Sequence, residues 1–471
     1  MTLNEASKIY VGTNDNRYAV VRNSVFTKLW VFVSYTLSTI TSGAIDFIKD
    51  GLGTLTLSGA NSYTGKTIVR RGTLATSAAN KISDSSAVEV DSGATFQIGG
   101  SETIASIAGA GNVTMGANSL TLAGSTSTDF SGNLTSSTGI FTKTGTSTQT
   151  LSGTTTFGGT VQLRGGTLLI LSGTHTQTTA SNPRNFQLSS LAGTVSTLTI
   201  SGGTLISTGL FMGENGGGTS TINCNGGTFQ VNGMAWEAGI SSTLNINGGT
   251  FLTQGFDLGG GSGTTTSIVN LNSGVMTLTS ALRWGLVGGA TATSVFSLNG
   301  GTLNCNSFVR SGGTNTFNFN GGTFVATVNV TLPTPFNYIV QSGGANFSTN
   351  SGVTLTTGGL SDGGGGGGVT KLGAGTLVLS GTLLYTGATS TLAGTTRRIV
   401  NNGGTSPGTV TGTANFTNTT LSVSFNVVPS SGMTFKFFPT STTQSYASVT
   451  LTNGGGLTPS YDAATSTLTL T

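Results

Sequence analysis

The feature that most constrains the fold is a repeat of roughly 21 to 27 residues, a period typical of solenoids. Each copy holds a short stretch of alternating apolar and polar residues, then a glycine-rich turn, then another apolar residue. Alternation sends the apolar side chains to one face of a strand, and a single repeat cannot bury that face alone. Six turns mark the clearest copies: Gly202-Gly203-Thr204, Gly226-Gly227-Thr228, Gly248-Gly249-Thr250, Ser273-Gly274-Val275, Gly300-Gly301-Thr302 and Gly321-Gly322-Thr323.

This pattern predicts an all-β, single-stranded, right-handed parallel β-solenoid (β-helix) in which each repeat forms one coil. We expect the solenoid over residues 46–399, in about 15 coils. Leu244, Phe251 and Phe317 should then lie in its core. Residues 1–45 are expected to form an N-terminal cap or anchor, and residues 400–471 a small C-terminal β cap or sandwich, because uncovered end coils would expose unpaired strand edges.

Asparagine occupies the same position in five repeats, immediately before the turn. An asparagine amide both donates and accepts hydrogen bonds, so identical residues one coil apart can form a ladder. The predicted structural ladder consists of Asn225, Asn247, Asn272, Asn299 and Asn320.

The composition excludes several classes of protein. Charged residues make up 7% of the chain and glycine 76 of its 471 positions, whereas about a quarter of an ordinary soluble domain is charged. Hydrophobic residues still reach 35% and proline is limited to 7, which favours many short strands over a disordered linker. The 18 basic and 14 acidic groups are spread thinly, so we expect no nucleic-acid partner.

The first 45 residues differ from the repeats, because basic residues precede an aromatic and aliphatic run. Trp30, Phe32 and Tyr35 are candidate anchor residues that would dock to other structural proteins of the same assembly. The alternative is a secretory signal peptide, cleaved near the small residues Ser42-Gly43-Ala44.

No catalytic, cofactor or metal site is expected. Polysaccharide cleavage needs carboxylates held close together at one groove, and Glu214, Glu237 and Asp257 fall at different offsets in their repeats. Asp257 and Arg283 are predicted to form an outward ion pair. His175 is predicted to be an exposed loop residue. The repeat turns lack the aspartates of calcium-binding solenoids.

The two cysteines, Cys224 and Cys305, lie several repeats apart. We therefore expect them to be small core residues and not a disulfide pair.

Three further segments share a different consensus. They are Gly53–Gly59 with Tyr63–Gly65 and Gly72–Leu74, Gly145–Gly153 with Phe157 and Gly165–Leu168, and Gly375–Gly381 with Tyr385–Gly387. The pattern resembles the autotransporter-associated β-strand repeat, the passenger-associated repeat of autotransporter β-helices. The resemblance implies a passenger-like β-helix displayed on a bacterial surface, in which the repeats aid export and folding.

Three classes of function follow, all placing the chain outside the cell or on a virion. The main expectation is a non-enzymatic fibre or appendage of a virion, such as a phage, that mediates attachment; the retained Met1 and the missing C-terminal translocator barrel favour it. The alternative is a secreted autotransporter-like adhesin or matrix protein. A surface glycan or receptor would be the ligand in either case, and a homo-oligomer is expected.

The third class is a polysaccharide-degrading or ice-binding solenoid. Ice binding requires a flat outward face of regularly spaced Thr-x-Thr motifs. Such motifs are frequent, as at Thr148–Thr150 and Thr197–Thr199, but the sequence does not align these over successive repeats.

Overall fold

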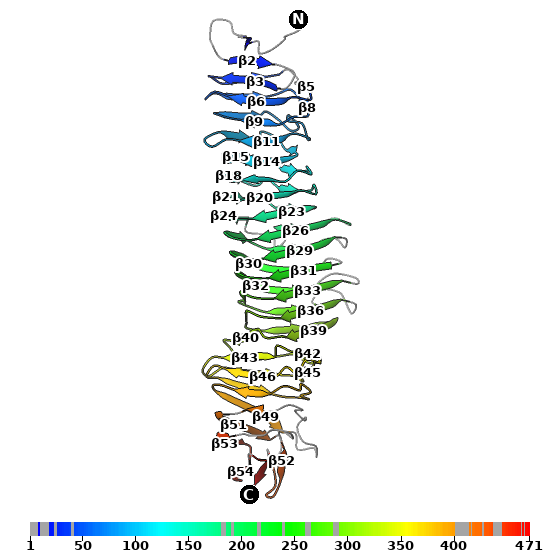
Figure 1. Ribbon diagram of the computed structural model, residues 1–471, viewed down its shortest axis with the longest axis vertical. Coiled ribbons are helices and arrows are strands. Elements are labelled where there is room, and N and C mark those ends of the chain that lie inside the picture. The colour runs from blue at the N-terminus through cyan, green and yellow to red at the C-terminus, as the bar shows by residue number, and fades with distance from the viewer. Residues whose placement is uncertain are drawn as a thin grey trace. The chain divides into compact units, whose positions relative to one another are not determined.

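The computed structural model (Figure 1) describes residues 8–9, 18–22, 26–38, 42–179, 185–189, 193–213, 218–237, 241–259, 265–285, 292–400, 414–415, 417–425, 428–436, 445–462, 464–465 and 467–471. Within these residues every regular element is a β-strand. The chain divides into two compact units, residues 1–242 and 243–471. Parallel strands stack coil on coil in both units, in about 16 coils over the described residues, which confirms the predicted β-solenoid.

Three faces of parallel strands form the first unit. Face A consists of β3 (Phe26–Val31), β6 (Asp46–Asp50), β9 (Thr67–Val69), β11 (Ala87–Val90), β14 (Ser106–Gly109), β17 (Thr128–Phe130), β20 (Thr148–Leu151), β23 (Gly166–Ile170), β26 (Val195–Ile200) and β29 (Thr219–Cys224). Face B consists of β4 (Tyr35–Leu37), β7 (Thr54–Leu57), β10 (Thr73–Thr76), β12 (Thr95–Gln97), β15 (Asn112–Gly116), β18 (Asn133–Ser136), β21 (Thr154–Phe157), β24 (Thr174–Gln177), β27 (Thr204–Ser207) and the start of β30 (Thr228–Glu237).

The third face of this unit is shorter. Face C consists of β13 (Glu102–Ile104), β16 (Leu120–Leu122), β19 (Phe141–Lys143), β22 (Val161–Leu163), β25 (Phe186–Leu188), β28 (Leu210–Met212) and the end of β30. A further parallel pair joins β5 (Ser42–Gly43) to β8 (Ser62–Tyr63).

The N-terminal end of the first unit combines two kinds of pairing. β1 (Lys8–Ile9) and β2 (Tyr18–Arg22) pair antiparallel, and β2 pairs antiparallel with β3. From β3 onward, however, the strands pair in parallel with the coil that follows. β3, β4 and β5 thus already pair in parallel with strands of the solenoid, while the domain boundaries at 45 and 399 stay predictions.

The core of the first unit follows from strand alternation. Inward residues on face B align coil by coil, and each is buried. The column consists of Leu55, Leu74, Phe96, Val113, Leu134, Thr155, His175, Leu205 and Phe229. Each side chain therefore covers the one in the next coil, as stacking of identical units requires.

The second unit repeats this architecture, with β31 (Ser241–Ile246) spanning the division between units in the sequence. Its parallel sets are β33 (Thr266–Leu271), β36 (Thr293–Leu298), β39 (Thr314–Phe319), β42 (Asn337–Val340) and β45 (Ser361–Asp362); β32 (Thr250–Leu258), β34 (Val275–Leu278), β37 (Thr302–Cys305), β40 (Thr323–Ala326), β43 (Ala345–Thr349), β46 (Val369–Leu372), β48 (Thr389–Thr391) and β50 (Ala414–Asn415); and β35 (Leu282–Trp284) with β38 (Phe308–Arg310). Leu244, Phe251 and Phe317 are fully buried, as predicted.

Parallel stacking continues toward the C-terminus. β41 (Val330–Thr331), β44 (Thr354–Thr357), β47 (Thr376–Leu379), β49 (Thr395–Val400), β51 (Thr417–Phe425) and β53 (Ser445–Thr452) form one parallel sheet. The last strands, β52 (Thr434–Lys436), β54 (Pro459–Asp462) and β55 (Thr467–Leu470), form a separate antiparallel sheet. Pairing thus changes from parallel to antiparallel in these strands, and the cap expected over residues 400–471 stays a prediction.

The Gly-Gly-Thr turns depend on glycine for two reasons. Gly227 has a φ of 63°, a left-handed conformation that other residues rarely adopt. A Cβ atom built there would also lie 2.4 Å from the carbonyl oxygen of Gly203 in the preceding coil. Stacked turns therefore leave no room for a side chain at this position.

Candidate functional site

Three lysines lie inside the solenoid at matching positions. Lys49 is in β6, Lys143 in β19 and Lys371 in β46, and all three are at most 1% exposed. Each is followed two residues later by glycine, at Gly51, Gly145 and Gly373. Buried lysines are rare unless their ammonium groups find partners.

Backbone carbonyls are those partners. Nζ of Lys49 donates to the oxygens of Gly51, at 2.6 Å, and Arg71, at 2.7 Å. Nζ of Lys143 donates to the oxygen of Gly145 at 2.5 Å.

The third lysine has the fullest set of acceptors. Nζ of Lys371 donates to the oxygens of Leu372, Gly373 and Ala393, at 2.5, 2.7 and 3.2 Å. Like Arg71 for Lys49, Ala393 lies 22 residues further along the chain, one coil away. The lysine therefore closes the turn that follows it and ties that turn to the next coil.

Burial affects the protonation of all three lysines. Desolvation lowers the pKa of each to about 8. For Lys49, the neighbouring Asp50 carboxylate opposes this shift, and the Arg71 guanidinium adds to it. The carbonyls thus only partly compensate for the loss of water around the ammonium group.

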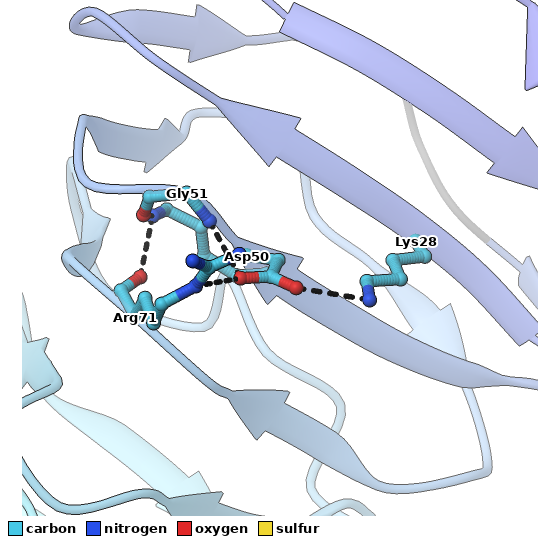
Figure 2. Close-up of polar contacts among 5 residues, drawn as sticks. Lys28, Asp50, Gly51 and Arg71 are labelled. Atoms are coloured by element: carbon cyan, nitrogen blue, oxygen red, sulfur yellow. Dashed lines mark hydrogen bonds and ion pairs between the residues drawn. The ribbon is translucent and has the colours of Figure 1, made fainter.

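The Lys49 turn belongs to a larger polar cluster, which Figure 2 shows. Asp50, 4% exposed, pairs with Lys28 at 2.9 Å and with Arg71 at 2.6 Å, and it accepts a hydrogen bond from the Gly51 N–H at 2.8 Å. Burial alone would raise the pKa of the Asp50 carboxyl. The hydrogen bonds outweigh that effect and hold the pKa well below its usual value. Because Lys28 lies in β3, Asp50 in β6 and Arg71 after β9, the cluster joins three coils.

Of the candidate anchor residues, Trp30 lies beside this cluster. The Trp30 ring is half-buried and lies 4.3 Å from Nζ of Lys28, and Tyr35 is half-buried in β4. Phe32 is 59% exposed in the turn between β3 and β4. Docking through these residues stays a prediction.

Asparagine amides form a continuous hydrogen-bonded ladder in the second unit. Nδ2 of Asn272 donates to Oδ1 of Asn247 at 2.7 Å, Asn299 donates to Asn272 at 2.8 Å, and Asn320 donates to Asn299 at 3.1 Å. Asn320 in turn accepts from the Gly343 N–H at 3.0 Å. Asn225 belongs to the first unit, where its backbone N–H donates to Ile200.

The expectation of an exposed His175 is wrong. His175 is fully buried in β24, with Nδ1 3.0 Å from Oγ1 of Thr155 and Nε2 donating to the Ser172 oxygen at 2.8 Å. Burial lowers the pKa of its imidazole. The alternation Thr174-His175-Thr176 places the ring inward, where Thr155 in the preceding coil supplies a polar partner.

The expected outward ion pair between Asp257 and Arg283 also needs correction. Oδ1 of Asp257 lies 3.6 Å from Nη1 of Arg283, but Asp257 is only 3% exposed. Burial raises the pKa of Asp257 to about 6, partly offset by the positive charge of Arg283.

The other acidic candidates give no cluster in the part of the chain described. Glu214 and the side chain of Glu237 lie outside the described residues. No group of three His, Cys, Asp or Glu side chains able to hold a metal ion occurs among the described residues. Those residues also contain no helix with the length and apolar character of a membrane span.

Both cysteines are buried and unbridged. Burial raises the pKa of Cys224 to about 12 and that of Cys305 to about 11, so both thiols stay protonated at neutral pH.

Comparison with known proteins connects the lysine turns to a described repeat. The family named Passenger-associated-transport-repeat matches residues 47–75, 141–170 and 369–397, and each match has one of the buried lysines as its third residue. Sequence reasoning located these segments from their glycines and leucines but missed the lysines. The signal was present, because Lys-x-Gly recurs at the start of all three copies.

Part of the chain is similar to an autotransporter adhesin. The chain is 39% identical over 90 residues to the adhesin BmaC autotransporter of Brucella suis biovar 1 (strain 1330). The aligned stretch covers 19% of this chain and 3% of that adhesin. No solved structure matches the chain. Three segments of this β-solenoid therefore match the passenger-associated transport repeat, and each contains a buried lysine.

Proposed function

We propose that the chain is a secreted, non-enzymatic β-solenoid of the bacterial cell surface with an adhesin-like role. The observation that carries the proposal is the threefold occurrence of the passenger-associated transport repeat in a parallel solenoid. Similarity to an autotransporter adhesin supports the same role. Between the two main expectations from the sequence, these findings favour the secreted adhesin and lend no support to a virion appendage.

The chemistry of the chain fits exposure on a surface. Only 7% of the residues are charged, and many exposed positions hold threonine, serine or asparagine. Their hydroxyl and amide groups form hydrogen bonds with glycans or receptor proteins without a strong dependence on salt. A glycan or receptor ligand is accordingly part of the proposal.

The N-terminal coils provide a candidate docking surface. Phe32, Val33 and Leu52 expose 59, 47 and 81% of their area in turns of neighbouring coils. Apolar side chains this exposed favour contact with a partner. We keep docking through residues 1–45, and self-association, as parts of the proposal.

Localisation tests the proposal directly. Antibodies against the purified chain should label intact cells of the producing organism, and external protease should remove that label while a cytoplasmic marker survives. Recovery of the chain in purified virus particles, with no label on intact cells, would instead establish the virion appendage and refute the proposal.

Adhesion is tested separately from localisation. Beads coated with the full chain should bind host cells or matrix more than beads coated with an unrelated protein of similar charge. If the chain is on the cell surface but the beads bind no better than the control, the adhesin role fails while the surface location stands.

A further inference from the structure

One face of the first unit presents a long uncharged column of side chains to solvent. On face B the outward residue at the start of each strand aligns over nine successive coils, and every one is threonine or asparagine. The column consists of Thr54, Thr73, Thr95, Asn112, Asn133, Thr154, Thr174, Thr204 and Thr228.

A second column runs beside the first over four of these coils. Thr114, Thr135, Thr156 and Thr176 follow two residues after the first-column residues of β15, β18, β21 and β24, and they are in register with one another. We call these eight outward residues, Asn112, Thr114, Asn133, Thr135, Thr154, Thr156, Thr174 and Thr176, the Thr/Asn array. Within the described part of the chain, none of the eight side chains hydrogen-bonds to another protein group. Their polar groups therefore face solvent.

Backbone pairing fixes the spacing of the array. Adjacent parallel strands lie about 4.8 Å apart, and residues i and i+2 of a strand about 6.6 Å apart. The residues between them, including Val113 and Leu134, are fully buried, which holds the strands in place from below. Threonine is also stiff at χ1 because it is β-branched. The array is thus a regular two-dimensional grid of hydroxyl and methyl groups from six threonines and amide groups from two asparagines.

Strand propensity alone does not account for this grid. Valine and isoleucine fit strands as well as threonine does, yet neither occurs in the nine-coil column. The second unit provides a contrast, because the outward positions of β32, β34, β37 and β40 are Thr250 and Leu252, Val275 and Thr277, Thr302 and Asn304, and Thr323 and Val325. Aligned Thr/Asn pairs over four coils are therefore a property of face B in the first unit.

We propose that the Thr/Asn array binds crystalline water, that is, the surface of ice. A ligand that contacts the whole array must present hydrogen-bonding groups at regular intervals in two dimensions. The water molecules at an ice surface are spaced in this way, at intervals of a few ångströms. The array holds no charged side chain for an ionic ligand and no aromatic ring for stacking on a sugar. Its six β-branched threonine side chains lose little entropy on binding, which favours a weakly interacting ligand such as water.

The strand register changes the expectation that Thr-x-Thr motifs do not align over successive coils. Thr148 and Thr150 are in register with Thr167 and Leu169, so that motif does not repeat, as expected. The motifs that do align, at residues 112–114, 133–135, 154–156 and 174–176, could be recognised only once the register was known.

Ice partitioning and thermal hysteresis of the purified full chain test the proposal. The wild-type chain should be enriched in slowly grown ice and should separate its freezing and melting points, whereas serum albumin should do neither. Thr156→Tyr, in the middle of the array, should abolish most of this binding. Thr302→Tyr, an outward position in the second unit, should leave it unchanged. Circular dichroism and the Tm of each variant establish that it is folded.

A milder variant guards against misfolding. Thr156→Val keeps the β-branched shape and replaces the hydroxyl by a methyl group, so it should weaken ice binding without lowering the Tm. Absence of wild-type ice binding, or equal loss in Thr156→Tyr and Thr302→Tyr, overturns the proposal. Adsorption to insoluble cellulose or chitin that Thr156→Tyr removes, without ice binding, overturns it in favour of a glycan surface. None of these outcomes depends on the proposed adhesin role.

Discussion

At the scale of single residues, the solenoid core tolerates charge where the backbone supplies partners. Lys49, Lys143 and Lys371 place their ammonium groups against the carbonyl oxygens of the turns that follow them. Each lysine still has a pKa near 8, so the folded state binds protons less readily than the unfolded state, in which the lysine pKa is near 10.5.

This difference predicts a pH-dependent stability for the Lys143 turn. Between about pH 8 and pH 10.5 the unfolded chain holds more protons, so the contribution of Lys143 to the free energy of unfolding rises with pH through that window. The Tm of the wild type relative to Lys143→Met should therefore increase from pH 7.5 to pH 10. Comparing the two proteins at each pH cancels the opposing ionisation of Cys224 and Cys305. A constant difference would contradict the assignment.

Asp257 predicts the opposite slope at lower pH. Its folded pKa of about 6 exceeds the unfolded value of 3.8, so stability falls as pH rises between those values, because the folded state must then release a proton it prefers to keep. Asp257→Asn cannot ionise and should raise the Tm relative to the wild type more at pH 7.5 than at pH 4.5. Equal effects at both pH values would show that the carboxyl is not buried.

At the scale of structural elements, side chains of successive coils are connected by hydrogen bonds in one place and by ion pairs in another. The ladder of Asn247, Asn272, Asn299 and Asn320 runs over four coils in the second unit, and the Asp50 cluster joins three coils in the first. Identical amides can form such a line only because the turns stack in register.

The ladder should contribute measurably to stability. Asn272→Ala removes one donor and one acceptor, and we expect a loss of about 1 kcal/mol in the free energy of unfolding, measured with urea. Asn337→Ala is the matched control, because Asn337 is an exposed asparagine in β42 whose side chain makes no hydrogen bond within the described residues. Equal losses in both variants would refute a role for the ladder.

The Asp50 cluster should matter more than an exposed ion pair. Asp50→Asn removes the negative charge that Lys28 and Arg71 share and leaves Lys49 without a neighbouring carboxylate, so the Tm should fall by several degrees. Glu89→Gln, which breaks the exposed pair of Lys66 and Glu89, should change it little. The reverse order of effects would contradict the interpretation of the cluster.

At the scale of the whole molecule, repetition made the fold predictable. Alternation around Leu244 and Phe251 and the Gly-Gly-Thr turns specify an inward face and a coil length, and the observed Asn-to-Asn spacings of 25, 27 and 21 residues agree with the predicted period. Polar residues inside the coils were not predictable in the same way. Lys143 and His175 lie inward because the alternation places them there. Asp257 is buried although the alternation in β32 assigns it an outward position. The chemistry of these three side chains alone suggests the surface.

Register is the other property that the sequence left open. The Thr/Asn array depends on which residues of four coils lie side by side, and loops of unequal length hide that relation in the linear sequence.

The lysine turn does not keep to one face of the solenoid. It follows face A at Lys49, face C at Lys143 and the β46 strand at Lys371, although the three segments share one consensus. A duplicated segment could consequently begin on any of the faces of a coil. Genes encoding such chains could thus gain or lose copies by recombination and change the length of the solenoid. Each inserted copy would bring the buried lysine that hydrogen-bonds its own turn.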